Sequence, residues 1–572
     1  MKALTFILYS YSLLFLLSGC KKTLDVENVA AFDPNKVWND PQLAQAYLTN
    51  LYAQALPGSW PVNSGGYADE LAGNLQTDAV TSASGPFKDW PYATIRNINI
   101  LFNEIDKGTL SDDTKNPIKG QGYFLRAWVY FNMVILYGGV PIIDKPQGLN
   151  DDLFVARNST KECFDFIEAD LQQALTLLPD KYSGDDRGRI DKAAVLAFLG
   201  RVLLFKASPQ FHSSNPYNNA DWSEAYEANK MAKDQLAAMG YGLVPNYADI
   251  WSKENKGNQE AILSVVFNSP NKTNGRQEDA CRPLSESKNA TGGDQPVWEM
   301  IEAFPMKDGY QPGASPNYAY DLQAYWQNRD PRFYNSIVYN GSIYELSNKA
   351  GRRQYTAKGI ATNEDMFGPG ELFNRTGFYP RKGMDSTLPQ AAVTENETDW
   401  IELRYAEVLL NFAEAANETE HPAEVMSVLI EIRQRAGIEP GPANLYGLSA
   451  GMTREQLREA IYHERRIEFI YEGKRFNDLR RTRRLNLIDG MSKHGLLATL
   501  KPGKDPAEGI TYSLLPEDFT YSILPLLSNG TNVMSTPDTY YFFPIPKSEI
   551  DKNLKLEQNI GWDGGTFNPV LD

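Results

Sequence analysis

A charge-dense stretch near the C-terminal end, residues 453–480, places the strongest constraint on the fold. Thr453 followed by Gln456 has the spacing of a capping box, which predicts that a helix begins there. Gly473 is expected to break that helix. Acidic and basic side chains alternate along it between aliphatic and aromatic residues, so the charges cannot all face solvent. Because buried charge is tolerated only when it is paired, the sequence predicts ion pairs inside the fold.

Two interpretations of these charges compete. In the first, Arg465, Glu468, Glu472 and Arg475 form a structural ion-pair network. In the second, two of Glu464, Glu468 and Glu472 are a catalytic carboxylate pair of a secreted hydrolase, as in glycoside hydrolysis. Arginines alternate with the acids, which would keep the carboxylates ionised, whereas a general acid needs a raised pKa. We therefore favour the structural interpretation.

The same stretch resembles the C-terminal signature of the SusD/RagB family, the lipid-anchored, glycan-capturing proteins of Gram-negative outer membranes. Other elements of the family occur in the family's order, and they are Leu136-Tyr137-Gly138-Gly139-Val140-Pro141, Ala207-Ser208-Pro209 with Asn215-Pro216-Tyr217, Asp330-Pro331-Arg332-Phe333, and Tyr541-Phe542-Phe543-Pro544-Ile545-Pro546. The resemblance covers nearly all of the chain after its leader. It is weakest over 245–400 and 486–535, where a ligand site would be expected.

The N-terminus has the features of a lipoprotein signal peptide over residues 1–19. Lys2 precedes an apolar run, 4–17, that is too short to span a bilayer. The run ends in small residues before Cys20, which resembles a bacterial lipobox. We expect Cys20 to be lipidated and to anchor the chain to the outer membrane, exposed at the cell surface, through a tether over 20–40. An ordinary signal peptide followed by an incidental cysteine is the alternative.

Helical periodicity predicts helices in two blocks, separated by an irregular region. They are expected at 41–56, 92–106 and 117–137, then from Ser159, Asp191 and Asp221, and finally at 401–417 and 422–436. Small residues such as Ala193 and Gly200 would let paired helices approach. Short strands are expected at 261–267 and 333–339. The predicted fold is mainly α, a divergent tetratricopeptide-like helical-repeat solenoid with an irregular, loop-rich lobe containing short strands.

These patterns divide the chain after its tether into four regions. The predicted regions are a helical repeat over 41–243, an aromatic, Gly- and Pro-rich ligand lobe over 244–400, a helical pair with the signature helix over 401–485, and a loop-rich segment over 486–572 that packs back on the helical lobe.

Several kinds of chemistry lack their sequence signals. The chain has no Gly-rich phosphate loop, no His-Glu-x-x-His and no Gly-x-Ser-x-Gly, and its four histidines have no metal-ligand spacing. A formal net charge of -16 argues against nucleic acid, because phosphate binding requires clustered Lys and Arg. We therefore predict that the protein is not an enzyme and needs neither cofactor nor metal.

A glycan site requires aromatic platforms beside polar groups, because sugars combine apolar C–H faces with polar edges. Two aromatic loops, 59–91 and 298–326, offer this combination. The candidate ligand-binding residues are Trp60, Tyr67, Asp69, Trp90, Trp298, Tyr310, Tyr318, Tyr320 and Trp326. Each aromatic residue taken singly could equally belong to a core.

The resemblance implies a function as well as a fold. It implies an outer-membrane lipoprotein that binds oligosaccharides at the cell surface and delivers them to a TonB-dependent transporter of the SusC type. The expected partners are then the transporter barrel, an oligosaccharide ligand, and the membrane through Cys20. The alternative is a tetratricopeptide-like surface scaffold that binds a peptide or a protein.

Overall fold

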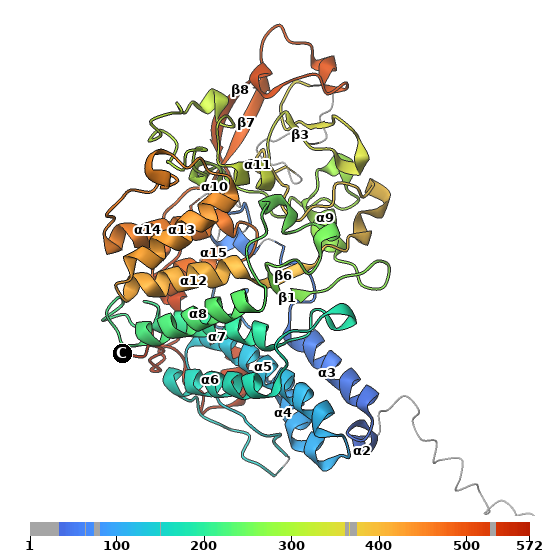
Figure 1. The fold of residues 1–572 in the computed structure, drawn as a ribbon, viewed down its shortest axis with the longest axis vertical. Coiled ribbons are helices and arrows are strands. Elements are labelled where there is room, and N and C mark those ends of the chain that lie inside the picture. The colour runs from blue at the N-terminus through green and yellow to red at the C-terminus, as the bar shows by residue number, and fades with distance from the viewer. Residues whose placement is uncertain are drawn as a thin grey trace, which may run out of the picture.

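The computed structural model describes residues 34–62, 64–73, 80–148, 150–360, 365, 374–526 and 533–572 of the 572-residue chain. The leader, Cys20 and most of the tether lie outside the described residues. A stack of helices forms the lower part of the molecule, and a loop-rich lobe ending in a hairpin forms the upper part (Figure 1). Within the described ranges, no helix is both long and apolar enough to cross a membrane.

The helical part is built from two blocks of sequence. The first block contains α2 (Pro34–Val37), α3 (Pro41–Ala55), α4 (Tyr92–Glu104), α5 (Asp112–Tyr137), α6 (Thr160–Leu177), α7 (Lys192–Ala207) and α8 (Asp221–Ala238). The second contains α12 (Tyr405–Glu418), α13 (Pro422–Ala436), α14 (Arg454–Glu468) and α15 (Arg475–Arg481). Neighbours pack successively, α5 on α6, α7 on α8, α8 on α12 and α12 on α13. This arrangement confirms the predicted mainly α, tetratricopeptide-like fold.

Local signals explain where several of these helices begin. The Ser159 hydroxyl accepts a hydrogen bond from the Glu162 amide, and the Glu162 carboxylate accepts one from the Ser159 amide, which is a complete capping box. Thr453 and Gln456 form a second capping box at the start of α14. Further inside, α7 is buried along almost its whole length. A Cβ at Gly200 would lie 2.4 Å from Oδ1 of Asn229, so the close approach of α7 to α8 requires glycine there.

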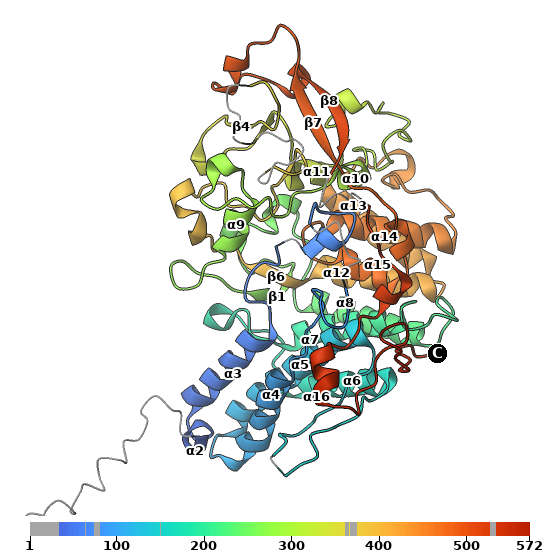
Figure 2. The same ribbon diagram turned by 180° about the vertical axis from the view of Figure 1, so that it is seen from behind.

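The upper lobe contains short strands and helices joined by loops. Strand β1 (Ala261–Val265) pairs antiparallel with β6 (Trp400–Arg404), β2 (Ile337–Val338) with β5 (Tyr379–Pro380), β3 (Ser342–Ile343) with β4 (Arg353–Gln354), and β7 (His494–Leu500) with β8 (Phe519–Pro525). The short helices are α9 (Gly275–Cys281), α10 (Trp298–Ala303) and α11 (Pro331–Ser336). The β7–β8 hairpin extends furthest from the N-terminal helices (Figures 1 and 2).

The C-terminal segment returns to the helical part. Its helix α16 (Lys547–Lys552) lies near α5 and α6 when the molecule is seen from behind (Figure 2). The Phe543 amide donates to the carbonyl of Leu136 at 2.7 Å, and the Leu571 amide donates to the carbonyl of Phe211 at 2.7 Å. These backbone bonds tie the end of the chain to the first helical block.

Two elements differ in type from the sequence predictions. Residues 333–339 were predicted as a strand, but most of them belong to α11, because Asp330 caps the helix and Pro331 occupies its first turn. Residues 401–404 were predicted as the start of a helix, but they form β6 because they pair with β1. The segment 486–572, predicted as loop-rich, contains the β7–β8 hairpin.

Two helix boundaries also differ. Helix α14 ends at Glu468 rather than at Gly473, and the turn that follows places Tyr471 at a φ of 66°. Helix α5 begins at Asp112, five residues before its predicted start. Helix α8 begins at Asp221 as predicted, but the Asp221 carboxylate contacts the His212 ring at 2.7 Å and does not cap the helix.

Candidate ligand-binding cavity

A cavity of about 790 Å³ lies where the helical part meets the upper lobe. Its walls come from the loop after α3, the loop before α4, the face of α5, strand β6 and the turn between α14 and α15. These segments are far apart in the sequence, so the cavity exists only because the helical stack brings them together.

The aromatic residues that line the cavity pack against other aromatic rings of the protein. Trp90 is half-buried, and its ring centroid lies 5.0 Å from Tyr92 and 5.7 Å from Tyr137. Phe87, also half-buried, stacks on Phe543 at 4.0 Å. Trp128 and Trp400, which are 5% and 2% exposed, also line the cavity. Rings fixed in this way offer apolar contact area at little cost in conformational entropy.

Fixed ion pairs form the polar part of the wall. Arg201 binds Glu407 through two hydrogen bonds, of 2.7 and 2.8 Å, and Lys474 donates to Glu407 at 2.9 Å. Burial alone would raise the pKa of Glu407, but these two cations outweigh it and hold that pKa far below its usual range. Glu407 therefore stays ionised near neutral pH, carries no proton to donate, and holds Arg201 and Lys474 in place at the wall.

Glu402 extends this polar wall toward the aromatic side. It accepts from Arg201 at 2.9 Å and from the indole N–H of Trp400 at 3.0 Å. Donors and acceptors thus lie directly beside the aromatic rings. This combination suits a ligand that has both apolar faces and hydroxyl groups.

Of the nine predicted ligand-binding residues, Trp90 lies in this cavity. Three other indoles are buried and offer no face to a ligand. Trp60, 4% exposed, donates its indole N–H to the carbonyl of Thr398 at 3.2 Å. Trp298 and Trp326, 3% and 7% exposed, belong to the apolar core of the upper lobe. We therefore leave these three tryptophans out of the site.

The remaining predicted residues have other surroundings. Tyr67 packs on Phe87 at 5.1 Å, and the Tyr318 hydroxyl donates to Glu439 at 2.9 Å. Tyr320 packs against the core of the upper lobe. Tyr310 lines a separate cavity of about 640 Å³ beside α14. The structure does not bring these tyrosines together with Trp90.

Asp69 was predicted to bind a ligand, but it forms ion pairs within the protein. Its carboxylate binds the Arg475 guanidinium at 2.8 and 2.9 Å and lies 3.0 Å from Arg466. Because two arginines already occupy this buried carboxylate, it is not available to a sugar. The pair instead fastens the loop before α4 to the segment after α14.

The four charged residues of the predicted network are all paired, but none of the ion pairs joins two of the four. Arg465 binds Asp478, and Arg475 binds Asp69. Glu468 binds Arg332, Arg404 and Arg435, and Glu472 binds Arg404 and Lys382. These ion pairs thus connect α14 and the turn after it to the upper lobe, to β6 and to α13.

The carboxylates of α14 are poorly suited to acid catalysis. Burial alone would raise the pKa of Glu464, Glu468 and Glu472. The surrounding cations, chiefly arginines, outweigh burial, so that all three pKa values lie below their usual range. A glycoside hydrolase requires one carboxyl with a raised pKa, which this group does not provide.

A buried carboxyl beside Asp69 predicts a pH-dependent stability. Burial raises the pKa of Glu70 to about 7, from an ordinary value of 4.5, although its hydrogen bond with the Tyr471 amide opposes this shift. The favourable contribution of the protonated form is complete below about pH 4.5 and is lost as the pH rises through about 7. We expect Glu70→Gln to raise the free energy of unfolding by up to about 3 kcal/mol at pH 8 and much less at pH 5. Urea unfolding at both values measures the difference, and equal effects at the two would contradict the assignment.

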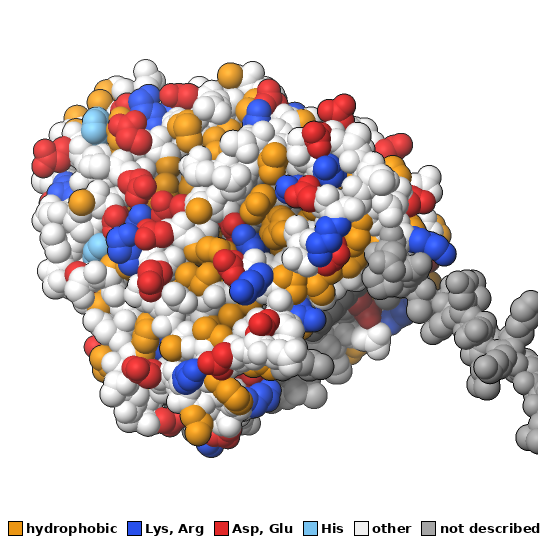
Figure 3. Space-filling model, turned by 90° about the horizontal axis from the view of Figure 1, so that it is seen from below, with side chains coloured by type: hydrophobic (Ala, Val, Ile, Leu, Met, Phe, Trp, Pro, Cys, Tyr) orange, Lys and Arg blue, Asp and Glu red, His pale blue; other side chains and the backbone are white. Residues whose placement is uncertain are grey.

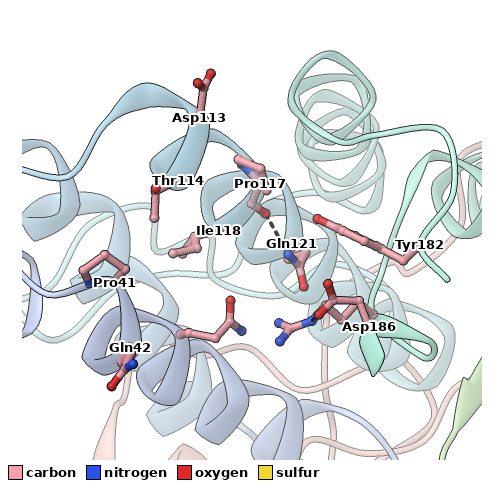
Figure 4. A pocket seen from close by; sticks show the side chains of 11 residues that line it. Pro41, Gln42, Asp113, Thr114, Pro117, Ile118, Gln121, Tyr182 and Asp186 are labelled. Carbon is pink, nitrogen blue, oxygen red and sulfur yellow. Dashed lines mark hydrogen bonds and ion pairs between the residues drawn. The ribbon is translucent and has the colours of Figure 1, made fainter. Parts of the chain in front are cut away.

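Another cavity, of about 510 Å³, lies between α3, α5 and the residues before α7 (Figure 4). Pro41 and Gln42 form one side, and Tyr182 and Asp186 form the opposite side. Tyr182 is the one aromatic residue that lines it. Seen from below, acidic and basic side chains are interspersed with apolar ones, and no charge of one sign dominates this face (Figure 3). The cavity with Trp90 is therefore the better candidate for an aromatic-stacking ligand.

No cluster of His, Cys, Asp and Glu that could hold a metal ion is found in the part of the chain that the structure describes. Helix pairs stacked in series, beside a cavity lined by aromatic and ion-paired residues, define a helical-repeat fold. A family model described as "SusD family" matches residues 259–562, and one described as "Starch-binding associating with outer membrane" matches residues 40–204. The chain belongs to the SusD family.

Individual relatives agree with this assignment. SusD-like protein P2 of Formosa agariphila is 26% identical over 411 residues, which are 70% of this chain and 72% of the relative. A crystal structure of a SusD-like protein from Bacteroides fragilis is 27% identical, with a TM-score of 0.73 over 92% of this chain and 98% of that one. A SusD-like carbohydrate binding protein from the same species is 22% identical, with a TM-score of 0.71 over 91% and 99% of the two chains, and shares the fold.

Proposed function

We propose that this protein is an outer-membrane lipoprotein that binds oligosaccharides and delivers them to a TonB-dependent transporter of the SusC type. The observation that carries the binding proposal is the cavity in which Trp90 and Phe87, both half-buried, lie beside the fixed ion pairs of Glu402 and Glu407. Rigid rings can stack on the C–H faces of a sugar while the charged groups bond to its hydroxyls.

The relatives support the same ligand class. One similar structure is described as carbohydrate binding, and one matching family model is described as starch-binding and associated with the outer membrane. Anchoring through a lipidated Cys20, exposure at the cell surface and partnership with a transporter barrel belong to the proposal through the family. The protein acts in this proposal as a passive carrier rather than as an enzyme.

Replacement of Trp90 with alanine tests the site. Because Trp90 is half-buried, its loss should leave the fold intact while removing a stacking surface. We expect affinity for the best ligand in a panel of neutral oligosaccharides to fall about fivefold or more, which corresponds to about 1 kcal/mol or more. Isothermal titration calorimetry measures the change.

Tyr310→Ala is the matched control, because Tyr310 lines the separate cavity beside α14. It should leave the affinity unchanged. A loss of affinity in Tyr310→Ala with full binding in Trp90→Ala would assign the ligand to the other cavity. Binding of peptides but of no oligosaccharide would favour a peptide-binding scaffold instead.

A further inference from the structure

A smaller cavity, of about 260 Å³, lies in the upper lobe and shares a wall with the cavity of Trp90. Trp251 lines the smaller cavity and Trp400 the larger, and their ring centroids are 5.5 Å apart. The side chain of Lys382, in the smaller cavity, also donates to Glu472, which lines the larger, at 2.6 Å. The two cavities are therefore neighbours separated by side chains.

The smaller cavity contains a guanidinium without a carboxylate partner. Arg381 forms no ion pair among the described residues, although its guanidinium donates to the carbonyl of Ile343 at 2.5 Å and lies over the Tyr344 ring, 5.1 Å from the ring centroid. Its Nε is buried and has no acceptor. Glu345, whose charge favours the protonated form of Arg381, accepts from the Gly351 amide at 2.7 Å. Burial lowers the pKa of Arg381, but an arginine remains charged, so its positive charge lacks a counterion.

The other cations of this cavity are already neutralised. Lys253 binds Asp385 at 2.7 Å, and Lys382 binds Glu472 at 2.6 Å. The remaining acid, Glu254, is exposed at the rim and accepts from the Ser252 hydroxyl. Because water screens an exposed charge far more than a buried one, Glu254 does not compensate Arg381.

Neutral polar residues line the same cavity as Arg381. The indole N–H of Trp251, a residue that is nine-tenths buried, has no acceptor among the described residues. Ser386, Thr398 and Asn335 also line the cavity. A partly buried cation and an unpartnered donor both require acceptor oxygens, and the polar lining residues suit the hydroxyls of a sugar ring.

We propose that this cavity is a subsite for an acidic sugar, whose carboxylate or sulfate oxygens bind the guanidinium of Arg381. Arginine presents its N–H groups in a planar fork that matches two oxygens of either oxyanion. The proposal rests on the proposed function and deepens it, since it names acidic oligosaccharides as a ligand class of the protein.

The experiment compares acidic oligosaccharides with an uncharged one. Calorimetry on the full chain would use an oligogalacturonate, its methyl ester, and a sulfated galactan oligosaccharide. We expect at least one acidic ligand to bind about tenfold more tightly than the uncharged ester, and this advantage to shrink at higher salt. Which acidic ligand binds distinguishes a carboxylate from a sulfate subsite.

Arg381→Gln should remove that advantage while leaving affinity for the neutral ligand of the larger cavity unchanged. Arg381→Lys, which keeps the charge but lacks the planar fork, is the second variant if Arg381→Gln fails to fold, and it should weaken the acidic ligand several-fold. Equal affinity for the acidic ligands and the ester, with neutral glycans still bound, would overturn the subsite but not the proposed function. Failure of every oligosaccharide to bind would overturn both.

Discussion

Replacing Arg404 with methionine is expected to lower the free energy of unfolding by about 4 kcal/mol. Arg404, 1% exposed, is the last residue of β6, and its guanidinium donates to Glu260 at 2.6 Å, Glu468 at 2.8 Å and Glu472 at 2.7 Å. Methionine keeps much of the volume but leaves three buried carboxylates with one fewer cation. Removal of one partner from a buried ion pair typically costs 3–5 kcal/mol because the other charge stays uncompensated.

Urea unfolding followed by circular dichroism measures this loss. The matched control is Lys161→Met, which breaks an exposed ion pair with Asp165 on α6 and should leave the unfolding midpoint unchanged. An Arg404→Met protein as stable as the wild type would show that the ion pairs of α14 do not hold the two parts of the molecule together.

Replacing Trp298 with alanine is expected to cost about 3–5 kcal/mol of stability without a specific effect on glycan binding. The Trp298 ring packs at the edge of Tyr325, with centroids 5.5 Å apart, and lies within the apolar core of the upper lobe. The substitution would leave a large cavity that the surrounding rings can only partly fill. Unfolding curves measure the loss of stability.

Calorimetry on the folded fraction separates a core role from a binding role. The Trp298→Ala protein should bind oligosaccharides with wild-type affinity at a temperature where it remains folded. An unaltered stability together with lost binding would show that Trp298 is a ligand platform, as the sequence alone suggested.

Signals carried by neighbouring residues predicted much of the fold. Thr453 and Gln456, three positions apart, predicted the start of α14, and Ser159 with Glu162 predicted the start of α6. Both are local backbone interactions, so no knowledge of the rest of the chain is needed. The end of α14 was harder to predict from the sequence. Tyr471, in the turn after the helix, adopts a positive φ, and its amide donates to the carboxylate of Glu70, which is distant in the sequence.

The candidate site was much harder to predict because its residues meet only in the folded chain. Asp69 looked like a ligand group beside Trp60, but it binds Arg475, 406 residues later in the sequence. Trp128 and Trp400 line the cavity with Trp90, yet periodicity placed Trp128 on a helix face and no local pattern marked Trp400. Composition indicated that aromatic platforms were present, but burial decided which of them a ligand can reach.

The most direct test of the proposed site is a crystal structure of the full-length chain in complex with the oligosaccharide that binds it most tightly. The account predicts a sugar ring against Trp90, with hydroxyls bonded to the ion-paired groups around Glu402 and Glu407. An empty cavity there, with the oligosaccharide bound on another surface, would contradict it.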